Sequence, residues 1–220
     1  MTSWIVVAAA DRVALLDYFQ RGGICMYPLA LCSLLGLTII VYKAIYFRGI
    51  RLDGVRFAAA LAQRIRERGR TEAAIVAAAE KSPVAIVARA GLECANGSAG
   101  KTREAMDECA RLQVSRVEQY LSLLSTVAYI APLLGFLGTV TGMINAFEQI
   151  SMTNEVTPRL VAAGVSEALI TTAFGLMIAI PTYAAYNLFV ARVASIENDI
   201  ETVTSHIIAE LHPEALSVAA

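Results

Sequence analysis

The residue in this sequence best placed to do chemistry is Glu167. It lies in an apolar stretch, residues 162–189, that carries no other charged side chain. A carboxylate in a helix of membrane length costs about 2.5 kcal/mol or more, and such residues usually face a bundle interior or a wet pathway. A carboxylate held there can take up and release protons, which suits a proton relay. Alternatively, Glu167 reaches water at the outer interface, because it lies close to the start of the stretch.

Two threonines follow Glu167 on the same predicted helix. Thr171 is one turn beyond Glu167 and shares its face. Thr172 is rotated from Glu167 by roughly 140° and cannot share a narrow stripe with it. Thr172 could therefore face a neighbouring helix and contribute to a polar pathway. Equally, its hydroxyl could bond a carbonyl group of its own helix, as threonines in membrane spans commonly do.

Small residues line one broad face of the apolar stretch that precedes Glu167. They are Gly135, Gly138, Thr139 and Gly142. Gly138 and Gly142 form a GxxxG pattern. The stretch that contains Glu167 has a matching series, namely Gly164, Ala168, Thr171 and Gly175. Small residues let helices approach closely, and threonine can hydrogen-bond across the contact. We expect two close-packing helices in a tight oligomer around a narrow polar path, with a kink at Pro132.

Signatures of catalysis and of metal binding are absent from the sequence. It has no P-loop, no GxSxG, no HExxH and no pair of carboxylates within one apolar stretch. The four cysteines include no CxxC pair, and His206 and His212 have no ligand partners at zinc spacing. We therefore expect neither an enzyme nor a protein that uses a metal ion or another cofactor.

The composition indicates an integral membrane protein. Hydrophobic residues make up 57% of the 220 residues, against about 45–50% in soluble domains. The excess falls in three predicted transmembrane helices, residues 24–47, 121–147 and 162–189. The first would be about 36 Å long, enough to cross a hydrocarbon core of about 30 Å. The fold class is an all-α membrane protein, in which two of the transmembrane helices extend into a cytoplasmic helical region.

The distribution of charge predicts the orientation of the chain. Arg48 and Arg51 follow the first span, and basic residues remain frequent as far as Arg116. The positive-inside rule therefore assigns residues 48–120 to the cytoplasm. It explains the arginines more simply than nucleic-acid binding, which we do not expect. Lys43, near the cytoplasmic end of the first span, is suited to snorkel toward the interface.

The remaining segments follow from this orientation. Residues 1–23 are periplasmic and suit a helix that lies in the interface and contacts membrane lipids. Residues 148–161 form a periplasmic loop between the second and third spans. Residues 190–220 form a cytoplasmic helix or tail, so the N-terminus is periplasmic and the C-terminus cytoplasmic.

Local signals predict helix boundaries in the cytoplasmic region. Ser82 followed by Pro83 indicates an N-cap and a proline at the first helical position. Residues 96–100 read as a turn, and Thr102 is suited to cap the next helix. That helix, starting near Arg103, could run without a break into the second span.

Two stretches resemble the second and third spans of the MotA/TolQ/ExbB proton-channel family. Residues 130–147 read IAPLLGFLGTVTGMINAF, with the family's Ala-Pro, Gly-x-x-Gly-Thr-Val and closing Gly-x-x-Asn-x-Phe. Residues 165–187 read VSEALITTAFGLMIAIPTYAAYN, with its Glu-Ala-Leu, a threonine five residues after the glutamate, Gly-Leu, Ile-Pro and Tyr-Asn. The size and short loops resemble ExbB (biopolymer transport protein) and TolQ more than MotA, which has four spans. Thr141 departs from the pattern, because ExbB-like members often carry a bulky aromatic residue there.

The resemblance implies roles for residues of the two stretches. Glu167 matches the third-span glutamate, and Thr139 and Thr172 match the pore threonines of the second and third spans. The roughly 140° offset is accounted for if Thr172 faces Thr139 while Glu167 faces the central path. Thr171 is a further candidate for the proton pathway. The residues assigned to helix packing are Pro132, Gly135, Gly138, Gly142 and Gly175.

The resemblance also implies an assembly and a task. It implies that the chain, like members of this family, forms a homopentamer around two copies of a single-span partner of the ExbD/TolR type. This partner carries an aspartate in its span. The complex can work with a TonB- or TolA-like protein. The expected function is the proton-channel and stator subunit of a bacterial inner-membrane motor that energises TonB-dependent outer-membrane transport. The alternatives are a TolQ-like envelope-maintenance or gliding motor subunit and, from another class, an oligomeric membrane scaffold that conducts nothing.

Overall fold

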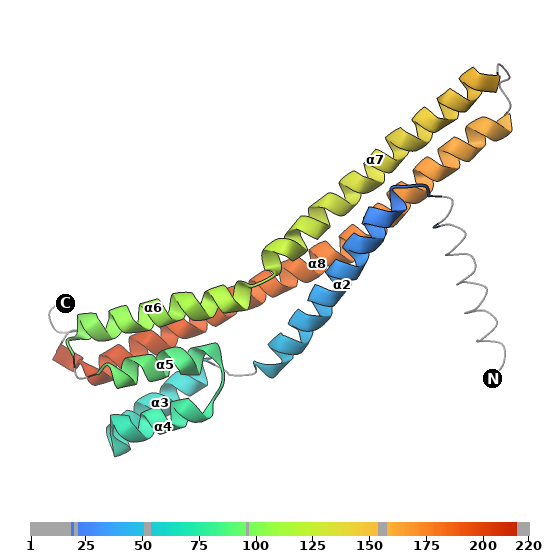
Figure 1. The fold of residues 1–220 in the computed structure, drawn as a ribbon. Helices are drawn as coiled ribbons and strands as arrows, with labels where there is room; N and C mark the ends of the chain where they lie inside the picture. The colour runs from blue at the N-terminus through green and yellow to red at the C-terminus, as the bar shows by residue number, and fades with distance from the viewer. Residues whose placement is uncertain (1–18, 20–21, 51–53, 96, 154–157, 215–220) are drawn as a thin grey trace, which may run out of the picture. The chain divides into compact units, whose positions relative to one another are not determined.

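The computed structural model describes residues 19, 22–50, 54–95, 97–153 and 158–214, and within these ranges the regular structure is helical (Figure 1). The helices are α2 (Met26–Gly49), α3 (Gly54–Arg68), α4 (Arg70–Ala79), α5 (Pro83–Glu93), α6 (Ala99–Glu118), α7 (Leu121–Thr153) and α8 (Pro158–Leu211). Three helical segments of the described chain are long and apolar enough to cross a membrane. The prediction of an all-α membrane protein is therefore confirmed. Most of the interfacial helix expected in residues 1–23, Asn96 of the expected turn and residues 154–157 of the expected loop lie outside the described residues.

The chain divides into two compact units. One combines the chain up to Tyr42 with Ser122–Asn187, and the other combines Lys43–Leu121 with the chain from Leu188 onward. The first unit therefore holds most of α2 and α7 and the first part of α8. The second holds α3 to α6 and the last part of α8.

The first unit has a small apolar core and a large apolar surface. Met26 and Leu29 of α2 pack with Ala131 of α7 and Ala179 of α8, while Phe174 lies partly buried beside them. Many large apolar side chains of the same helices are exposed, among them Leu34, Leu133, Phe136, Leu169 and Ile180. An apolar surface of this extent would be unfavourable in water, and it fits contact with lipid. Pro132 lies inside α7 and Pro181 inside α8, and both helices continue through them.

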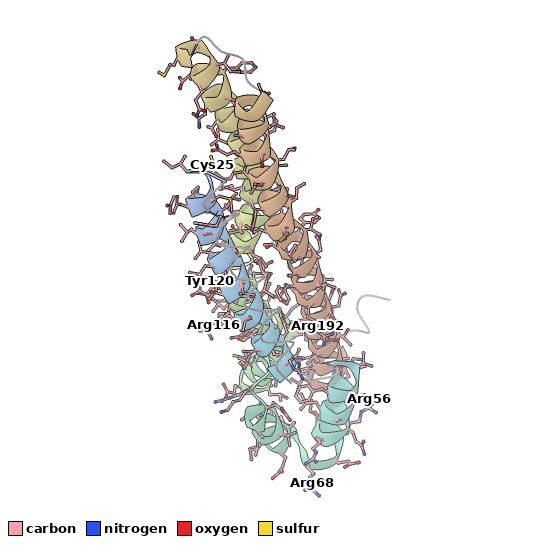
Figure 2. The ribbon with its side chains drawn as sticks, turned by 90° about the vertical axis from the view of Figure 1, so that its right-hand side faces the viewer. Cys25, Arg56, Arg68, Arg116, Tyr120 and Arg192 are labelled. Atoms are coloured by element: carbon pink, nitrogen blue, oxygen red, sulfur yellow. The ribbon has the colours of Figure 1, made fainter. Side chains whose placement is uncertain are left out.

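The second unit is a helical bundle with an alanine-rich core. Helix α3 buries Ala58 and Leu61, α4 buries Ala73 and Ala77, and α8 buries Val203. Small side chains let these short helices pack closely, and larger ones fill the centre, such as Met106 of α6, which lies against Gly91 of α5. The arginines labelled in Figure 2, Arg56, Arg68, Arg116 and Arg192, all belong to this unit.

The helix boundaries of the second unit match the local signals in one case and not in another. Ser82 is the N-cap of α5, as predicted, and its hydroxyl accepts a hydrogen bond from the Ala85 amide at 3.2 Å. Thr102 does not cap α6, because the helix begins four residues before Arg103 with Ser98 as its N-cap. The buried Thr102 hydroxyl instead donates to the Cys94 carbonyl and contacts His212 Nε2, both at 3.3 Å. It thus satisfies a carbonyl group at the end of α5.

Helix α6 does not run unbroken into α7. It ends at Glu118, and Tyr120 has a φ of 68°, a left-handed conformation that interrupts the helical hydrogen bonds. Lys43, which the sequence suggested would snorkel outward, is only 1% exposed and donates from Nζ to the Val117 carbonyl oxygen at 2.6 Å. It therefore satisfies a carbonyl group in the last turn of α6.

Loss of the Ser82 cap should destabilise α5. We expect Ser82→Ala to lower the local stability of this helix by about 1 kcal/mol, because a buried amide group loses its acceptor. Amide hydrogen exchange of α5 in detergent would measure the change. Ser98→Ala is the matched control, because its cap contact with the Lys101 amide is longer, 3.5 Å, and exposed. Equal losses in the two variants would contradict the assignment.

An ion pair joins α3 to α8 and should make the second unit sensitive to acid. Arg66 Nε donates to Glu210 Oε2 at 2.7 Å, and a second guanidinium nitrogen contacts Oε1. The hydrogen bonds from Arg66 hold the pKa of Glu210 below its ordinary value of 4.5. The stabilisation is therefore present above pH 4.5 and is lost as the pH falls through the lowered pKa.

The matching measurement is the thermal midpoint of the wild type and of Glu210→Gln between pH 7 and pH 3. The wild type should be the more stable at pH 7, by a small margin because Arg66 is exposed. The margin should shrink below pH 4.5. A margin that does not change with pH would show that the carboxylate of Glu210 does not contribute through its charge.

Candidate functional site

Glycines bring the backbones of α7 and α8 into direct contact. A methyl group built on Gly175 would lie 2.7 Å from the Ala131 carbonyl oxygen and 3.1 Å from the Gly135 Cα atom. One built on Gly142 would lie 3.1 Å from the Ala168 amide nitrogen. Any side chain at these positions would therefore push the helices apart. The structure uses this small-residue face to pack two helices of the same chain against each other.

Thr171 fills the space that Gly138 leaves on the facing helix. A methyl group on Gly138 would lie 2.5 Å from Thr171 Cβ and 2.9 Å from its Cγ2. The Thr171 side chain is fully buried, and its hydroxyl donates to the carbonyl oxygens of Ala168 at 2.9 Å and Glu167 at 3.2 Å. Thr171 therefore packs α8 against α7, and its hydroxyl is directed to its own helix.

Thr172 reaches the neighbouring helix. Its hydroxyl donates to the Gly135 carbonyl oxygen at 3.1 Å, so the alternative of a bond to its own helix does not hold. Thr139 lies one turn beyond Gly135 on α7, and its hydroxyl donates to the Phe136 carbonyl oxygen at 2.6 Å. Each of the two predicted pore threonines thus donates to a backbone carbonyl of α7, Thr172 from the facing helix α8 and Thr139 from within α7.

Glu167 is half-buried in α8 and lines a pocket at the end of the close contact between α7 and α8. The other lining residues are Asn145, Ala146, Gln149, Ala163, Gly164 and Ser166. Two carboxamides and a hydroxyl therefore line the same pocket as the carboxylate. Such groups can hydrogen-bond water or either protonation state of a carboxyl group.

The turn before α2 also contacts Glu167. The Oε1 atom of Glu167 occupies the space that a Cβ atom of Gly23 would need. Gly23 has a φ of 67°. Nearby, Cys25 Sγ and Thr141 Oγ1 are 3.7 Å apart. Sequence reasoning did not identify Gly23, Asn145 or Gln149 as part of the site. The available signals were the paired glycines directly before the first span and, for Asn145, the closing Gly-x-x-Asn-x-Phe motif of the second span.

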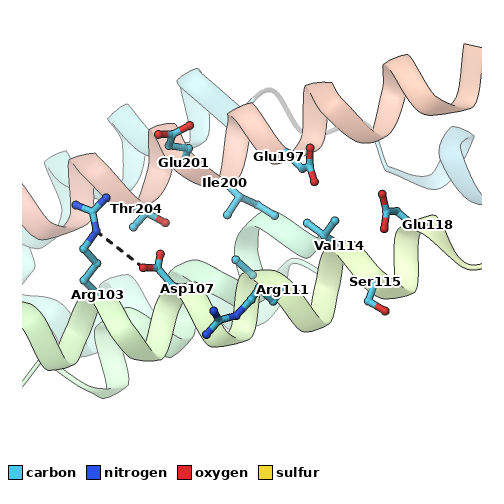
Figure 3. A pocket seen from close by; sticks show the side chains of 11 residues that line it. Arg103, Asp107, Arg111, Val114, Ser115, Glu118, Glu197, Ile200, Glu201 and Thr204 are labelled. Carbon is cyan, nitrogen blue, oxygen red and sulfur yellow. Dashed lines mark ion pairs between the residues drawn. The ribbon is translucent and has the colours of Figure 1, made fainter.

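A second pocket lies in the second unit, between α6 and the last part of α8 (Figure 3). Its charged lining residues are Arg103, Asp107, Arg111, Glu118, Glu197 and Glu201. Arg103 and Asp107 pair at 3.9 Å, one turn apart on α6. Charged side chains on helices that face water are common and form weak pairs, so this pocket is a weaker candidate than the one at Glu167. Across the described residues, no group of three or more His, Cys, Asp and Glu side chains could hold a metal ion.

Comparison with known proteins identifies relatives of this chain. The model of the MotA/TolQ/ExbB proton channel family matches residues 79–202, more than half of the chain. The Tol-Pal system protein TolQ of Haemophilus influenzae is 37% identical over 54% of this chain and 52% of its own length. The putative biopolymer transport protein ExbB-like 1 of Synechocystis is 31% identical over 80% of this chain and 71% of its own length. The biopolymer transport protein ExbB of Salmonella typhimurium is 34% identical over 44% of this chain and 41% of its own length.

The coverage of these matches has two features. The chain spans about half the length of the Haemophilus TolQ that it matches. The family match contains Thr139, Glu167, Thr171 and Thr172, but it begins at residue 79, after α2 and the turn that precedes it. The contact between Gly23 and Glu167 is therefore outside what the family model describes.

Filling the space at Gly138 should destabilise the protomer itself. We expect Gly138→Ala to cost about 1–3 kcal/mol, because the new methyl group overlaps the buried Thr171 side chain. Thermal unfolding in detergent would measure the loss. Gly49→Ala is the control, because a methyl group there meets no atom within 4 Å. If both variants unfold at the same temperature, the packing between Gly138 and Thr171 contributes nothing.

Proposed function

This chain belongs to the MotA/TolQ/ExbB proton channel family, and we propose that it is the proton-channel and stator subunit of an inner-membrane motor. The motor would use the proton motive force to energise TonB-dependent outer-membrane transport. The N-terminus of this chain would be periplasmic and its C-terminus cytoplasmic. The observation that carries the proposal is Glu167, a half-buried carboxylate in an apolar span beside a pocket with polar walls.

Glu167 is the group that takes up and releases the proton. Keeping a carboxylate at membrane depth costs about 2.5 kcal/mol or more, which makes a purely structural role for it unfavourable. Asn145, Gln149 and Ser166 provide donors and acceptors for water at the carboxyl group. Protons would reach Glu167 from this pocket.

The threonines continue the pathway along the two helices. Thr172 supports this role because its hydroxyl already spans the gap between α8 and α7. Thr139 lies one turn further along α7, where a hydroxyl can hold water. Thr171 contributes through position, because its packing on Gly138 fixes the register of the two helices at Glu167.

The assembly we propose is a homopentamer around two copies of an ExbD/TolR-like single-span protein, with a TonB- or TolA-like protein as the component that acts in the periplasm. The resemblance of residues 130–147 and 165–187 to the family's second and third spans supports it. One proton that crosses 100 mV releases about 2.3 kcal/mol, so several protons would drive one substantial mechanical step.

A second candidate function is that of a TolQ-like subunit in envelope maintenance, with a gliding or motility motor as a further variant. The observation in favour of the TolQ-like function is the 37% identity to the Haemophilus TolQ. The proposed channel and its carboxylate are the same in each case, because these motors differ chiefly in the partner proteins.

The test of the proposed function is Glu167→Gln in the complex isolated from its own host and reconstituted in liposomes. The substitution keeps the size of the side chain and removes its proton-binding carboxylate. We expect proton flux, followed with a pH-sensitive dye under an imposed membrane potential, to fall to the background of empty liposomes while the complex stays assembled.

Glu148→Gln is the matched control, because it is the same chemical change at an exposed residue of α7. It should leave the flux at the wild-type level. Undiminished flux in Glu167→Gln would rule out the carboxylate as the proton carrier. A wild-type complex that conducts no protons would favour the non-conducting scaffold.

A further inference from the structure

The turn before α2 contacts the candidate proton site from a part of the chain that the family match does not include. We propose that Gly23 is a positioning residue for Glu167: its backbone conformation and its lack of a side chain create the space in which the carboxylate lies. The inference rests on the proposed function, because the position of the carboxylate matters for conduction only if Glu167 carries the proton. The contact itself is independent of the function.

The atoms of the Glu167 carboxyl group define the contact. A Cβ atom built on Gly23 would overlap Oε1 and would lie 3.1 Å from Cδ and 3.7 Å from Cγ of Glu167. The end of the Glu167 side chain therefore points at the turn, and its oxygen lies closest. Any L-amino acid other than glycine would have to displace the carboxylate or the turn.

The backbone of Gly23 adds a second reason for glycine at this position. Its φ of 67° lies in the left-handed region, which side chains with a Cβ atom adopt only at a cost. The turn that aims the start of α2 over Glu167 therefore requires glycine for its conformation. The same residue type also leaves the carboxylate its space.

Two neighbouring contacts fix the turn on both helices of the site. Gly22 is buried, and a methyl group there would lie 3.5 Å from Ile170 Cγ2, one turn beyond Glu167 on α8. Cys25 is buried and approaches the Thr141 hydroxyl of α7 at 3.7 Å. A bulky aromatic residue in place of Thr141 would occupy the position that Cys25 takes. The turn is thus held against α7 and α8 at the level of the carboxylate.

Glu167 thus has two kinds of neighbour. Its carboxyl end lies against the backbone of Gly23, and the residue also lines the pocket with Asn145 and Gln149. The turn thereby limits the rotamers that Glu167 can adopt beside this pocket. The first span, beyond anchoring the chain in the lipid, sets the position of the group that carries the proton.

The test compares four variants of the assembled complex: Gly23→Ala, Gly22→Ala, Glu167→Asp, and Gly23→Ala combined with Glu167→Asp. Two quantities are measured on each. The first is the rate at which dicyclohexylcarbodiimide modifies the carboxyl group at position 167, read by peptide mass spectrometry. The second is proton flux in liposomes. Gly22→Ala is the matched control, because its new methyl group meets the buried Met26 side chain and not Glu167.

We expect Gly23→Ala to change the modification rate severalfold and to lower the flux by about tenfold or more, since a displacement of about 1 Å can cost 100-fold at a reacting group. Gly22→Ala should change neither quantity to this extent. Glu167→Asp alone should lower the flux, because the shorter side chain no longer reaches its position. In the Gly23→Ala background the same shortening relieves the overlap, so the double variant should conduct better than Gly23→Ala alone.

That rescue separates positioning from a general loss of stability. If Gly23→Ala only destabilised the turn, its loss of flux and that of Glu167→Asp would add in the double variant. Failure of the shorter side chain to rescue Gly23→Ala, or a modification rate in Gly23→Ala equal to that in Gly22→Ala, would overturn the inference. The modification rate does not depend on conduction. A changed rate at position 167 in a complex whose flux does not need Glu167 would support the positioning role and overturn the proposed function.

Discussion

The site depends on the direct contact between the backbones of α7 and α8. Lipid tails are as apolar as leucine side chains, so the hydrophobic effect contributes little to helix pairing within a membrane, and close packing must supply the stability. Gly135 and Gly175 meet backbone to backbone, and Thr171 fits the space above Gly138. This contact fixes the register of the two helices. It brings the Thr172 hydroxyl within reach of the Gly135 carbonyl oxygen, and it sets Glu167 beside the pocket that Asn145 and Gln149 line.

A carboxylate in such a pair of helices needs more than a register. Glu167 is a long side chain at the edge of the α7–α8 contact, and these two helices alone would leave it several rotamers. The turn before α2 lies against Glu167. Gly23 leaves room for the carboxylate there, because it has no side chain and a left-handed backbone conformation. The three apolar helices thus contribute differently: α7 and α8 form the contact and the pocket, and the start of α2 limits where the carboxylate can lie.

The sequence predicted the parts of the structure that local pattern determines. Apolar runs of membrane length predicted the three spans. Ser82 followed by Pro83 predicted the start of α5, because a cap is a contact between residues three positions apart. The lone charge in the third span drew attention to Glu167, whose part in a proton pathway stays a prediction. The motifs of the second and third spans identified the family, which the match over residues 79–202 confirms.

The features that the sequence did not predict depend on contacts between residues far apart in the chain. Thr102 looked like a cap, but its hydroxyl is used by Cys94 and His212. Lys43 looked like an interfacial residue, but it is buried against Val117 where α6 ends. The pair that Gly23 forms with Gly22 indicates a turn, but it does not tell which side chain will fill the space beside it. The partners of these residues become known only when the helices are packed.

The central claim is that this chain supplies one membrane carboxylate to a motor whose other carboxylate belongs to a partner. Native mass spectrometry of the complex extracted from its own host, with peptide sequencing of every component, tests that claim most directly. The account predicts five copies of this chain with a single-span protein that carries an aspartate in its span. A homo-oligomer without such a partner, under conditions that preserve known membrane complexes, would contradict it and would leave Glu167 without its counterpart.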